Sequence, residues 1–340
     1  MNILDRYTTK VQTYLHDILN KENFLYRKAL YHFGFIDQTG KDRKSVGWGK
    51  GLRSTILLLT IDSLKGELWE KAIPVAAAIE LFHNATLVVD DWQDKDVMRR
   101  GSPAVWALQD VGPEQGINVA FFLTVLSSKV LITLSAEEFA PNVLFTVQSL
   151  FEQTKISVIE GQQKDIAFEK VQEIGLDEYL DMIRHKTGVL IQSSILMGAL
   201  LADVDKQTLA SLVEFGNHLG LLFQMRDDFL GVYGDISKTG KPAEDVLHKK
   251  KSLPVVLAME YGTSTDKEAL TQIYASQKRD LSNAEILEVM NMFDALHIKD
   301  KMWEMIEKEY KRAVEVISKM HISKKDEFLF LTDLFAHRVK

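Results

Sequence analysis

The sequence predicts an all-α protein built as one large helical bundle. Long segments repeat apolar residues with helical periodicity, and no alternating strand pattern of useful length occurs. Helix-breaking proline is also scarce, with 6 in 340 residues. Length alone favours about two domains. No linker-like segment separates the apolar helices, however, so we expect residues 1–340 to form a single domain.

The helices follow from apolar stripes along the chain. Val11, Leu15, Ile18 and Leu19 form one stripe, and residues 76–87 are apolar on nearly every face, as in a buried helix. We expect further helices over residues 118–139, 144–168, 177–201, 207–230 and 284–318. The glycine-containing stretches 39–51 and 234–242 are expected to be loops.

Charge and composition exclude several classes of protein. The chain has 41 basic and 48 acidic residues, a net charge of −7, which argues against a general nucleic-acid binder. It contains no cysteine, so disulfides, thiolate metal sites and cysteine nucleophiles are absent. No stretch reaches about 18 consecutive apolar residues, and charged residues interrupt the beginning of the chain. We therefore expect no transmembrane helix, no signal peptide and a cytoplasmic location.

The first of two acidic clusters ends the apolar segment. Asp90 and Asp91 follow it directly, and Asp94 lies one helical turn after Asp90. Carboxylates stacked at a helix C-terminus repel each other and oppose the helix dipole, so they need a cation. Mg²⁺ suits this position because it takes carboxylate oxygens together with waters and substrate phosphates. At this point a solvated acidic helix end explains the spacing equally well.

The second cluster repeats the arrangement, with Asp227 and Asp228 near the end of the apolar segment 219–230. Basic residues gather in loops, either beside glycines or just after the first cluster: Lys50, Arg53, Arg99 and Arg100. Arginine binds phosphate bidentately and lysine acts as a point charge. The pattern suggests one diphosphate held through Mg²⁺ and a second anion held directly by basic side chains.

These motifs resemble the trans-isoprenyl diphosphate synthases, also called polyprenyl synthetases. The first cluster matches the family motif DDxxD, four residues, RRG, and the second matches FQxxDD, beginning at Phe223 and Gln224. The remaining family motifs occur in order, and the matching residues are Gly49, Lys50, Arg53, Glu80, His83, Gly161, Gln162, Asp165, Lys186, Thr187, Gly240, Lys241 and Lys250. The resemblance covers roughly residues 45–260.

The sequence departs from the family pattern at a few positions. Gly51 stands where arginine is frequent, and Gly231 replaces the third carboxylate of the second motif. Asp235 lies seven residues after Asp228, or roughly 10 Å along a continuing helix. We therefore do not assign Asp235 to the metal.

The resemblance implies a helical bundle around a central active-site cavity. It implies head-to-tail condensation of an allylic diphosphate with isopentenyl diphosphate, three Mg²⁺ ions, and a homodimer. The implied metal ligands are Asp90, Asp91, Asp94, Asp227 and Asp228. Direct positive charge for the allylic diphosphate is expected from Arg99, Lys186 and Lys241. The homoallylic diphosphate is expected to bind Lys50, Arg53, His83 and Arg100, with Lys250 as a further substrate-binding residue. The oxygens facing the allylic carbocation are expected from Thr187 and Gln224.

Alternatives remain open for function and for single residues. A class I terpene cyclase shares metal-triggered ionisation but binds no second diphosphate, which disagrees with the set Lys50, Arg53 and Arg100. A regulatory subunit of a heteromeric synthase usually lacks one aspartate motif, whereas both largely survive here. His83 could instead be a core histidine bonded to a backbone carbonyl, and Thr187 could bond back to its own helix.

Product length is expected to depend on the helix that ends at Asp90. Ala85 lies five residues upstream, about 7.5 Å along the axis. In the family, a bulky aromatic at this level stops growth at farnesyl diphosphate. The small Ala85 predicts longer products, foremost geranylgeranyl diphosphate. Phe82 is the expected cavity floor, with Phe121 or Phe122 on a neighbouring helix as the alternative.

Overall fold

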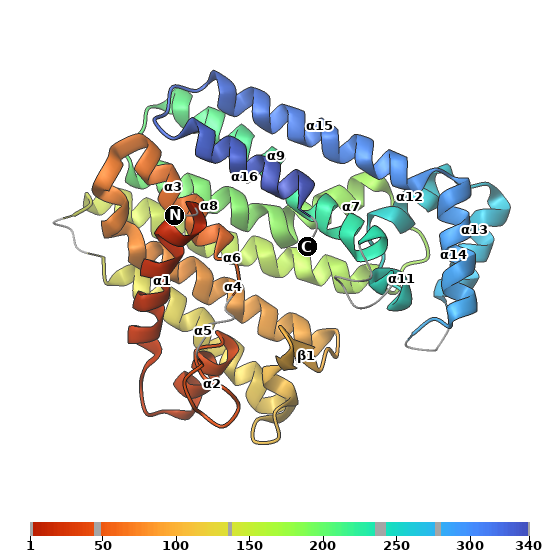
Figure 1. The fold of residues 1–340 in the computed structure, drawn as a ribbon, viewed down its shortest axis with the longest axis horizontal. Helices are drawn as coiled ribbons and strands as arrows, with labels where there is room; N and C mark the ends of the chain where they lie inside the picture. Colours follow the sequence, from red (N-terminus) through yellow and green to blue (C-terminus); the bar gives the residue numbers. More distant parts are fainter. Residues whose placement is uncertain (1–2, 44–48, 135–137, 235–242, 276–279, 339–340) are drawn as a thin grey trace. The chain divides into compact units, whose positions relative to one another are not determined.

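The structure is a computed structural model that describes residues 3–43, 49–134, 138–234, 243–275 and 280–338. Within these ranges the regular secondary structure is helical, apart from one hairpin of two-residue strands and an isolated bridge, which confirms the predicted all-α class (Figure 1). The chain divides into two compact units. The first comprises Met1–Glu152 and Ser194–Asp205, and the second comprises Gln153–Ser193 and Lys206–Lys340. The expectation of a single domain stays a prediction.

The first unit is organised around α4 (Ile73–Gln93), which begins with Pro74 in its first turn. This helix is apolar on most faces, and it packs on α1 (Ile3–Leu19), α3 (Leu52–Lys65) and α5 (Gly112–Ile132). Short α2 (Phe24–His32) packs on α5, and a 3₁₀ helix, Gly66–Ala72, connects α3 to α4. The first part of α6 (Pro141–Phe168) and the last part of α8 (Val189–Leu201) complete the unit.

The second unit is organised around α9 (Lys206–Tyr233), which packs against α7 (Leu176–Ile183), α15 (Ile298–Lys319) and α16 (Lys325–His337). In Figure 1 both α15 and α16 run alongside α9. The remaining helices of this unit are α11 (Glu244–Leu247), α12 (Leu253–Tyr261), α13 (Ser264–Tyr274) and α14 (Asn283–Ala295).

The predicted helix over 177–201 is confirmed as a continuous helical segment whose type changes along it, whereas the predicted helix over 284–318 is wrong because it is interrupted. The segment 177–201 contains a π-helical turn, Arg184–Gly188, between α7 and α8. Neighbouring backbone presses against this turn, since a Cβ atom added at Gly161 would collide with the backbone of Lys186. The segment 284–318 is broken between α14 and α15, where His297 adopts the left-handed conformation with φ of 54°. Apolar periodicity runs through the π-helical turn and through the break at His297, and therefore reveals neither.

Among the described residues, two segments are long and apolar enough to cross a membrane by length and composition alone, Leu52–Gln93 and Gly112–Ile132. The most apolar windows of these segments are 67% and 44% buried inside the protein, respectively. Core helices of globular proteins have the same character. The expectation of no membrane span therefore stays a prediction.

Candidate active site

The first aspartate motif lies where α4 ends. Asp91 is 1% exposed, and its Oδ1 accepts from Arg99 Nε at 2.6 Å and Nη2 at 2.5 Å. Arg99 Nη2 also lies 4.0 Å from Asp90 Oδ2. The Asp94 amide still bonds to the Asp90 carbonyl at 2.8 Å, so these two residues are one turn apart as predicted. Burial raises the pKa of Asp91 to about 6, against the opposing effect of the Arg99 charge.

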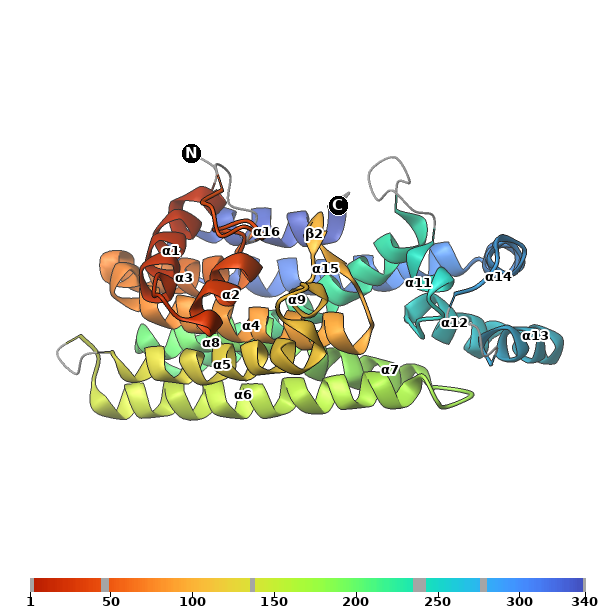
Figure 2. The same cartoon turned by 90° about the horizontal axis from the view of Figure 1, so that it is seen from below.

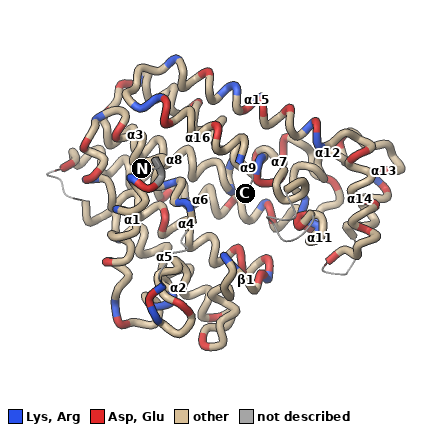
Figure 3. Tube along the Cα trace, in the orientation of Figure 1, with Lys and Arg blue, Asp and Glu red and all other residues tan. Residues whose placement is uncertain are grey.

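Arg99 reaches the motif from the small hairpin of β1 (Met98–Arg99) and β2 (Ser102–Pro103). The hairpin turns at Arg100 and Gly101, which adopt φ values of 52° and 73°. Glycine takes this left-handed conformation without steric cost. Because aspartates end α4 and arginines lie on the hairpin, charges of both signs gather where α4 meets β1 (Figure 3).

A basic cluster forms beside α4 in the same unit. Arg53 Nη1, at the start of α3, donates to His83 Nε2 at 3.1 Å, which replaces the alternative of a backbone-bonded core histidine. Burial, with the Arg53 and Arg100 charges, lowers the pKa of His83 well below its usual value. A Cβ at Gly49 would lie 3.2 Å from Arg100 Nη2, so the loop backbone passes close to that guanidinium. Lys50, the next residue, is exposed.

Glu80 has a structural part in this arrangement. Its Oε1 accepts from the Ser54 amide at 3.0 Å, which satisfies a free N–H in the first turn of α3. The contact fixes the start of α3, and Arg53 with it, against α4. Glu80 therefore positions His83 indirectly. It fixes the start of α3, and Arg53 on α3 holds the His83 ring.

Two residues of the basic cluster have no motif and were missed by the sequence analysis. His32 is buried, and its pKa falls to about 3 because of burial and the nearby Arg100 and Arg99 charges. Arg43 Nη2 donates to Ser102 Oγ at 2.8 Å. Both line a small cavity of about 20 Å³ together with Arg99 and Arg100. For Arg43 the sequence signal was the basic composition of the 39–51 loop, and His32 lies outside that loop.

The second aspartate motif lies on α9. Asp228 is buried and accepts three hydrogen bonds: from the Tyr179 hydroxyl, from the Leu253 amide at 2.8 Å, and from Gln224 Nε2 at 2.8 Å. Burial raises the pKa of Asp228 despite these donors. Asp227 is exposed and forms an ion pair with Arg338 at 2.7 Å. Sequence analysis missed both Tyr179 and Arg338.

The π-helical turn brings the lysine–threonine pair to the same part of the second unit. Lys186 Nζ forms an ion pair with Asp165 of the GQxxD motif on α6. Thr187 Oγ1 donates to Gln224 Oε1 at 2.6 Å, so the alternative in which Thr187 bonds back to its own helix is wrong. A hydrogen-bonded chain thus runs from Thr187 through Gln224 to Asp228.

A model of the polyprenyl synthetase family matches residues 43–292, which include both aspartate motifs and the basic loop. This chain belongs to the polyprenyl synthetase family. The family named by the sequence resemblance is thereby confirmed.

The relatives of this family member include synthases of different products. It is 35% identical over 238 residues to a (2E,6E)-farnesyl diphosphate synthase of Mycobacterium tuberculosis, covering 70% of this chain and 64% of the relative. It is 35% identical over 250 residues to a geranylgeranyl diphosphate synthase of that organism, covering 73% and 67%. It is 32% identical over 280 residues to a geranylgeranyl diphosphate synthase of Sulfolobus acidocaldarius, covering 80% and 81%. The chain thus spans slightly less than two thirds of the farnesyl diphosphate synthase.

Solved structures of the family share the fold. The polyprenyl synthetase of Streptomyces coelicolor is similar with a TM-score of 0.87 and 30% identity, covering 98% of each chain. A geranylgeranyl pyrophosphate synthetase of Pyrococcus horikoshii is similar with a TM-score of 0.86 and 25% identity, covering 98% of this chain and 97% of that one.

This family member has a further acid beside its second motif. A Cβ atom added at Gly231 would overlap the Asp245 carboxylate, so the missing side chain leaves room for that carboxylate. Burial and the Asp228 charge raise the pKa of Asp245, and the Lys250 charge opposes them. Asp245 was missed by the sequence analysis, because its approach to α9 depends on the chain path through α11. Lys241, Gly240 and Asp235 lie outside the described residues.

The carboxylates fit Mg²⁺ as the family implies. No three His, Asp or Glu side chains within the described ranges are arranged to hold a metal by themselves. Mg²⁺ does not require such a cage, because it binds through one or two carboxylates, waters and substrate phosphates. Asp91 Oδ2 is buried and makes no hydrogen bond, as expected of an oxygen reserved for a ligand.

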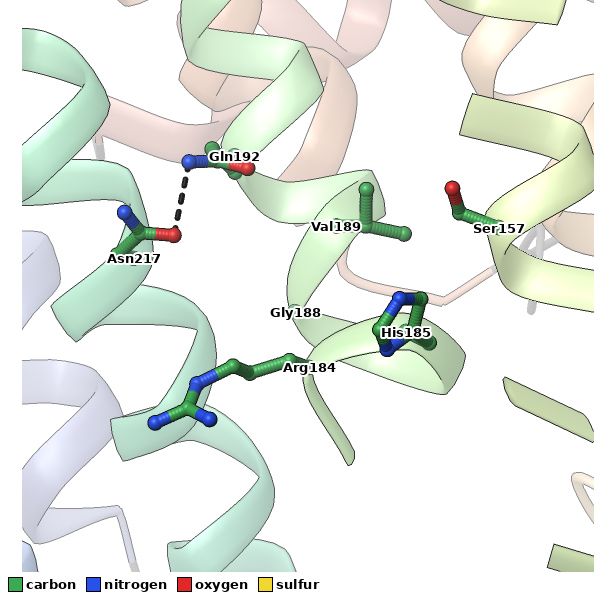
Figure 4. A pocket seen from close by; sticks show the side chains of 7 residues that line it. All are labelled: Ser157, Arg184, His185, Gly188, Val189, Gln192 and Asn217. Atoms are coloured by element: carbon green, nitrogen blue, oxygen red, sulfur yellow. Dashed lines mark hydrogen bonds between the residues drawn. The ribbon is translucent and has the colours of Figure 1, made fainter. Parts of the chain in front are cut away.

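A separate pocket of about 150 Å³ lies on the π-helical turn, between α6, α8 and α9 of the second unit (Figure 4). None of the predicted site residues lines it; the lining is Ser157, Arg184, His185, Gly188, Val189, Gln192 and Asn217. In Figure 4 Arg184 and His185 point to opposite sides, and Gln192 donates to Asn217 at 2.8 Å. The basic side chains of this pocket therefore do not converge on one ligand.

Proposed function

We propose that this chain is a chain-elongating trans-prenyltransferase. It joins an allylic diphosphate head to tail to isopentenyl diphosphate and releases diphosphate. The observation that carries the proposal is the convergence of Arg53, His83 and Arg100 next to the aspartates that end α4. A direct anion site beside carboxylates suited to Mg²⁺ matches a reaction between two diphosphates.

The homoallylic diphosphate binds the basic cluster without metal. Arg53 and Arg100 supply guanidinium groups, Lys50 adds a flexible point charge, and His83 remains neutral beside Arg53. The neutral imidazole avoids a further buried positive charge and keeps the Arg53 fork in place. We also assign His32 and Arg43 to the wall of this site, because they line the small cavity with Arg100.

The allylic diphosphate binds through Mg²⁺ and through direct cations. The ligands proposed for three ions are Asp90, Asp91, Asp94, Asp227 and Asp228. When bound, Mg²⁺ neutralises charge developing on the leaving diphosphate. Arg99, Lys186 and Lys241 add positive charge, and Lys250 is a further substrate-binding residue. Asp228 is already held by three donors, so it also positions α9 and Gln224.

Thr187 and Gln224 face the electron-poor allylic carbon. The Thr187 hydroxyl donates a hydrogen bond to Gln224, so the lone pairs of the Thr187 oxygen remain available to a cation. Gln224 is oriented in turn by its bond to Asp228. The proton lost after the new bond forms goes to the departing diphosphate, which makes a dedicated base unnecessary.

The function is tested by incubating the purified protein with Mg²⁺, isopentenyl diphosphate and each allylic starter, then sizing the products. Linear products that require both substrates are expected. Cyclic products from the allylic diphosphate alone would identify a terpene cyclase instead. Turnover only after addition of another synthase subunit would identify a regulatory subunit.

We propose products longer than farnesyl diphosphate, with geranylgeranyl diphosphate foremost. Ala85 is buried and has only a small side chain at its level of α4, and Phe82 is buried edge-to-face on Phe151 at 6.0 Å between ring centroids. The alternative floors fit less well, because Phe121 is exposed and Phe122 packs on Tyr26. Ala85→Phe should shorten the product to farnesyl diphosphate, and Phe82→Ala should lengthen it. A wild type that stops at farnesyl diphosphate would contradict this argument.

We propose a cytoplasmic homodimer without a membrane span. Large apolar side chains on α5 and on the first part of α6 are 66% to 74% exposed, namely Phe121, Val125, Ile132 and Phe145. These helices run side by side, joined by Ser128 and Glu152 (Figure 2). A second copy would bury this face. Val125→Asp should weaken the dimer in sedimentation, while Leu287→Asp, an exposed position on α14, should not.

A further inference from the structure

Arg338 follows α16 and lies against the second aspartate motif. Its Nη2 is 2.7 Å from Asp227 Oδ1 and also donates to the Phe223 carbonyl at 3.3 Å. The guanidinium covers the Phe223 ring at 4.2 Å from the centroid. The Arg338 side chain is 9% exposed, whereas that of Asp227 is 55% exposed. The exposed carboxylate is therefore neutralised by a cation that the fold has buried.

A second arginine fixes the backbone of Arg338. Arg226 donates from Nε at 3.2 Å and from Nη2 at 2.7 Å to the Arg338 carbonyl. Arg226 is itself held over the rings of Phe229 and Trp303, at 4.8 and 5.2 Å. The preceding helix is anchored by Phe335, whose ring meets Phe223 at 5.0 Å. The pairing of Arg338 with Asp227 is thus built into the packing of α16 on α9.

We propose that Arg338 is the resident counter-ion of Asp227 in the metal-free protein and that Mg²⁺ with diphosphate must displace it. This inference rests on the proposed function, in which Asp227 is a metal ligand. A carboxylate oxygen that accepts from a guanidinium offers less to a cation, and the two positive charges repel each other. Whatever free energy the ion pair contributes to the free protein is subtracted from metal binding.

Arg338 is accordingly a positioning residue that sets the affinity of the second motif. Without metal it holds Asp227 in a fixed place beside α16 and prevents unpaired repulsion between Asp227 and Asp228. When metal and diphosphate bind, Arg338 is released from Asp227. The Arg338 guanidinium contacts the Phe223 ring and the Phe223 carbonyl, and neither contact involves Asp227.

The test is calorimetric titration of Mg²⁺ into the full chain in the presence of inorganic diphosphate. Because Asp227 is half exposed, Arg338→Gln should bind the metal about two- to fivefold more tightly than wild type. Arg338→Lys, which keeps the charge, should return most of the affinity toward wild type. Arg312→Gln is the matched control, because Arg312 pairs with Glu309 at 3.1 Å on α15 and should leave metal affinity unchanged.

A thermal readout separates displacement from a merely structural role. Arg338→Gln should lower the melting temperature of the metal-free protein, and saturating Mg²⁺ with diphosphate should shrink that difference. An equal loss in both states, or metal affinity equal to or weaker than wild type, would overturn the proposal. A wild type that binds no Mg²⁺ with diphosphate would overturn it as well. Tighter binding by Arg338→Gln in a protein that forms no prenyl product would support it while refuting the proposed function.

Discussion

The two aspartate motifs share a composition but obtain their partners in different ways. In the first unit, buried Asp91 pairs with Arg99, which lies eight residues further along the chain on the adjoining hairpin. In the second unit, exposed Asp227 pairs with Arg338, which lies 111 residues away. The counter-ion of the first motif therefore lies on the same short segment of chain, whereas the counter-ion of the second motif is supplied only by the packing of α16 against α9.

The buried carboxylates differ in the same sense. Asp91 is held by a charged guanidinium, while Asp228 is held by neutral donors, the Tyr179 hydroxyl, the Gln224 amide and the Leu253 backbone. Burial raises the pKa of both carboxyl groups. Two motifs of similar sequence thus differ in how a buried carboxylate is stabilised. Asp91 is stabilised by a nearby opposite charge, and Asp228 is stabilised by hydrogen bonds that include long-range ones.

The largest expected effect comes from removing one carboxylate of either motif. Asp90→Ala and Asp227→Ala should each reduce product formation by about a thousandfold or more, because in the proposed function both motifs hold the Mg²⁺ that neutralises the leaving diphosphate. Steady-state assays with circular dichroism check this. Asp300→Ala, an exposed acid at the start of α15, is the control. Near-normal turnover in either variant, or full activity in chelator, would remove the metal assignment.

A smaller effect should distinguish the binding site of isopentenyl diphosphate from that of the allylic diphosphate. Arg53→Ala should raise the KM for isopentenyl diphosphate by about 10- to 100-fold, the size expected for a lost charged hydrogen bond. The KM for the allylic substrate should change little, because Arg53 belongs to the basic cluster with His83. Lys186→Ala, which removes the cation paired with Asp165, is the complementary variant. Equal changes in both KM values for Arg53→Ala would contradict the division of roles.

Removing the long-range donor should destabilise the second motif. Tyr179→Phe leaves buried Asp228 without one donor, which should cost about 1–3 kcal/mol of unfolding free energy. Tyr31→Phe is the matched control in the first unit, because Tyr31 donates to the neutral Pro103 carbonyl at 2.7 Å. Loss of that neutral bond should cost about 0.5–1.5 kcal/mol. Urea unfolding measures both, and a greater loss in Tyr31→Phe would reverse the comparison.

The smallest effect is a pH response of the basic cluster. The pKa of His32 in the folded protein, about 3, is below its unfolded value, so its contribution to stability is present above about pH 6.5 and is lost as pH falls. At pH 5.5 wild type should lose about 1.4 kcal/mol relative to His32→Gln. The groups facing His32 are Arg99, Arg100, His83 and Asn84.

Unfolding curves at pH 7.5 and 5.5 provide the measurement. His321→Gln alters an exposed histidine and should follow the wild-type pH dependence. Parallel curves for wild type and His32→Gln would mean that His32 takes up its proton over this pH range as readily in the folded state as in the unfolded state. The buried cluster would then tolerate a further positive charge.

The sequence alone was sufficient for the all-α class, the family, and the order of the motifs. Apolar periodicity identifies which helix faces are buried, and motif spacing identifies residues that act within one or two turns, such as Asp90 with Asp94. The pairing of Arg99 with Asp91 could also be reached from the sequence, because the two residues lie on the same short segment. These features depend on local backbone geometry, which the order of residues determines directly.

Only the tertiary structure decided the partners of the second motif. Tyr179, Asp245 and Arg338 reach α9 from three different helices or their ends, and no spacing along the chain relates them to Asp227 or Asp228. The π-helical turn and the break at His297 were equally hidden, because close backbone packing and a left-handed residue leave the apolar pattern unchanged. Such contacts arise when distant segments pack together, and a sequence pattern with a period of one helical turn carries no record of them.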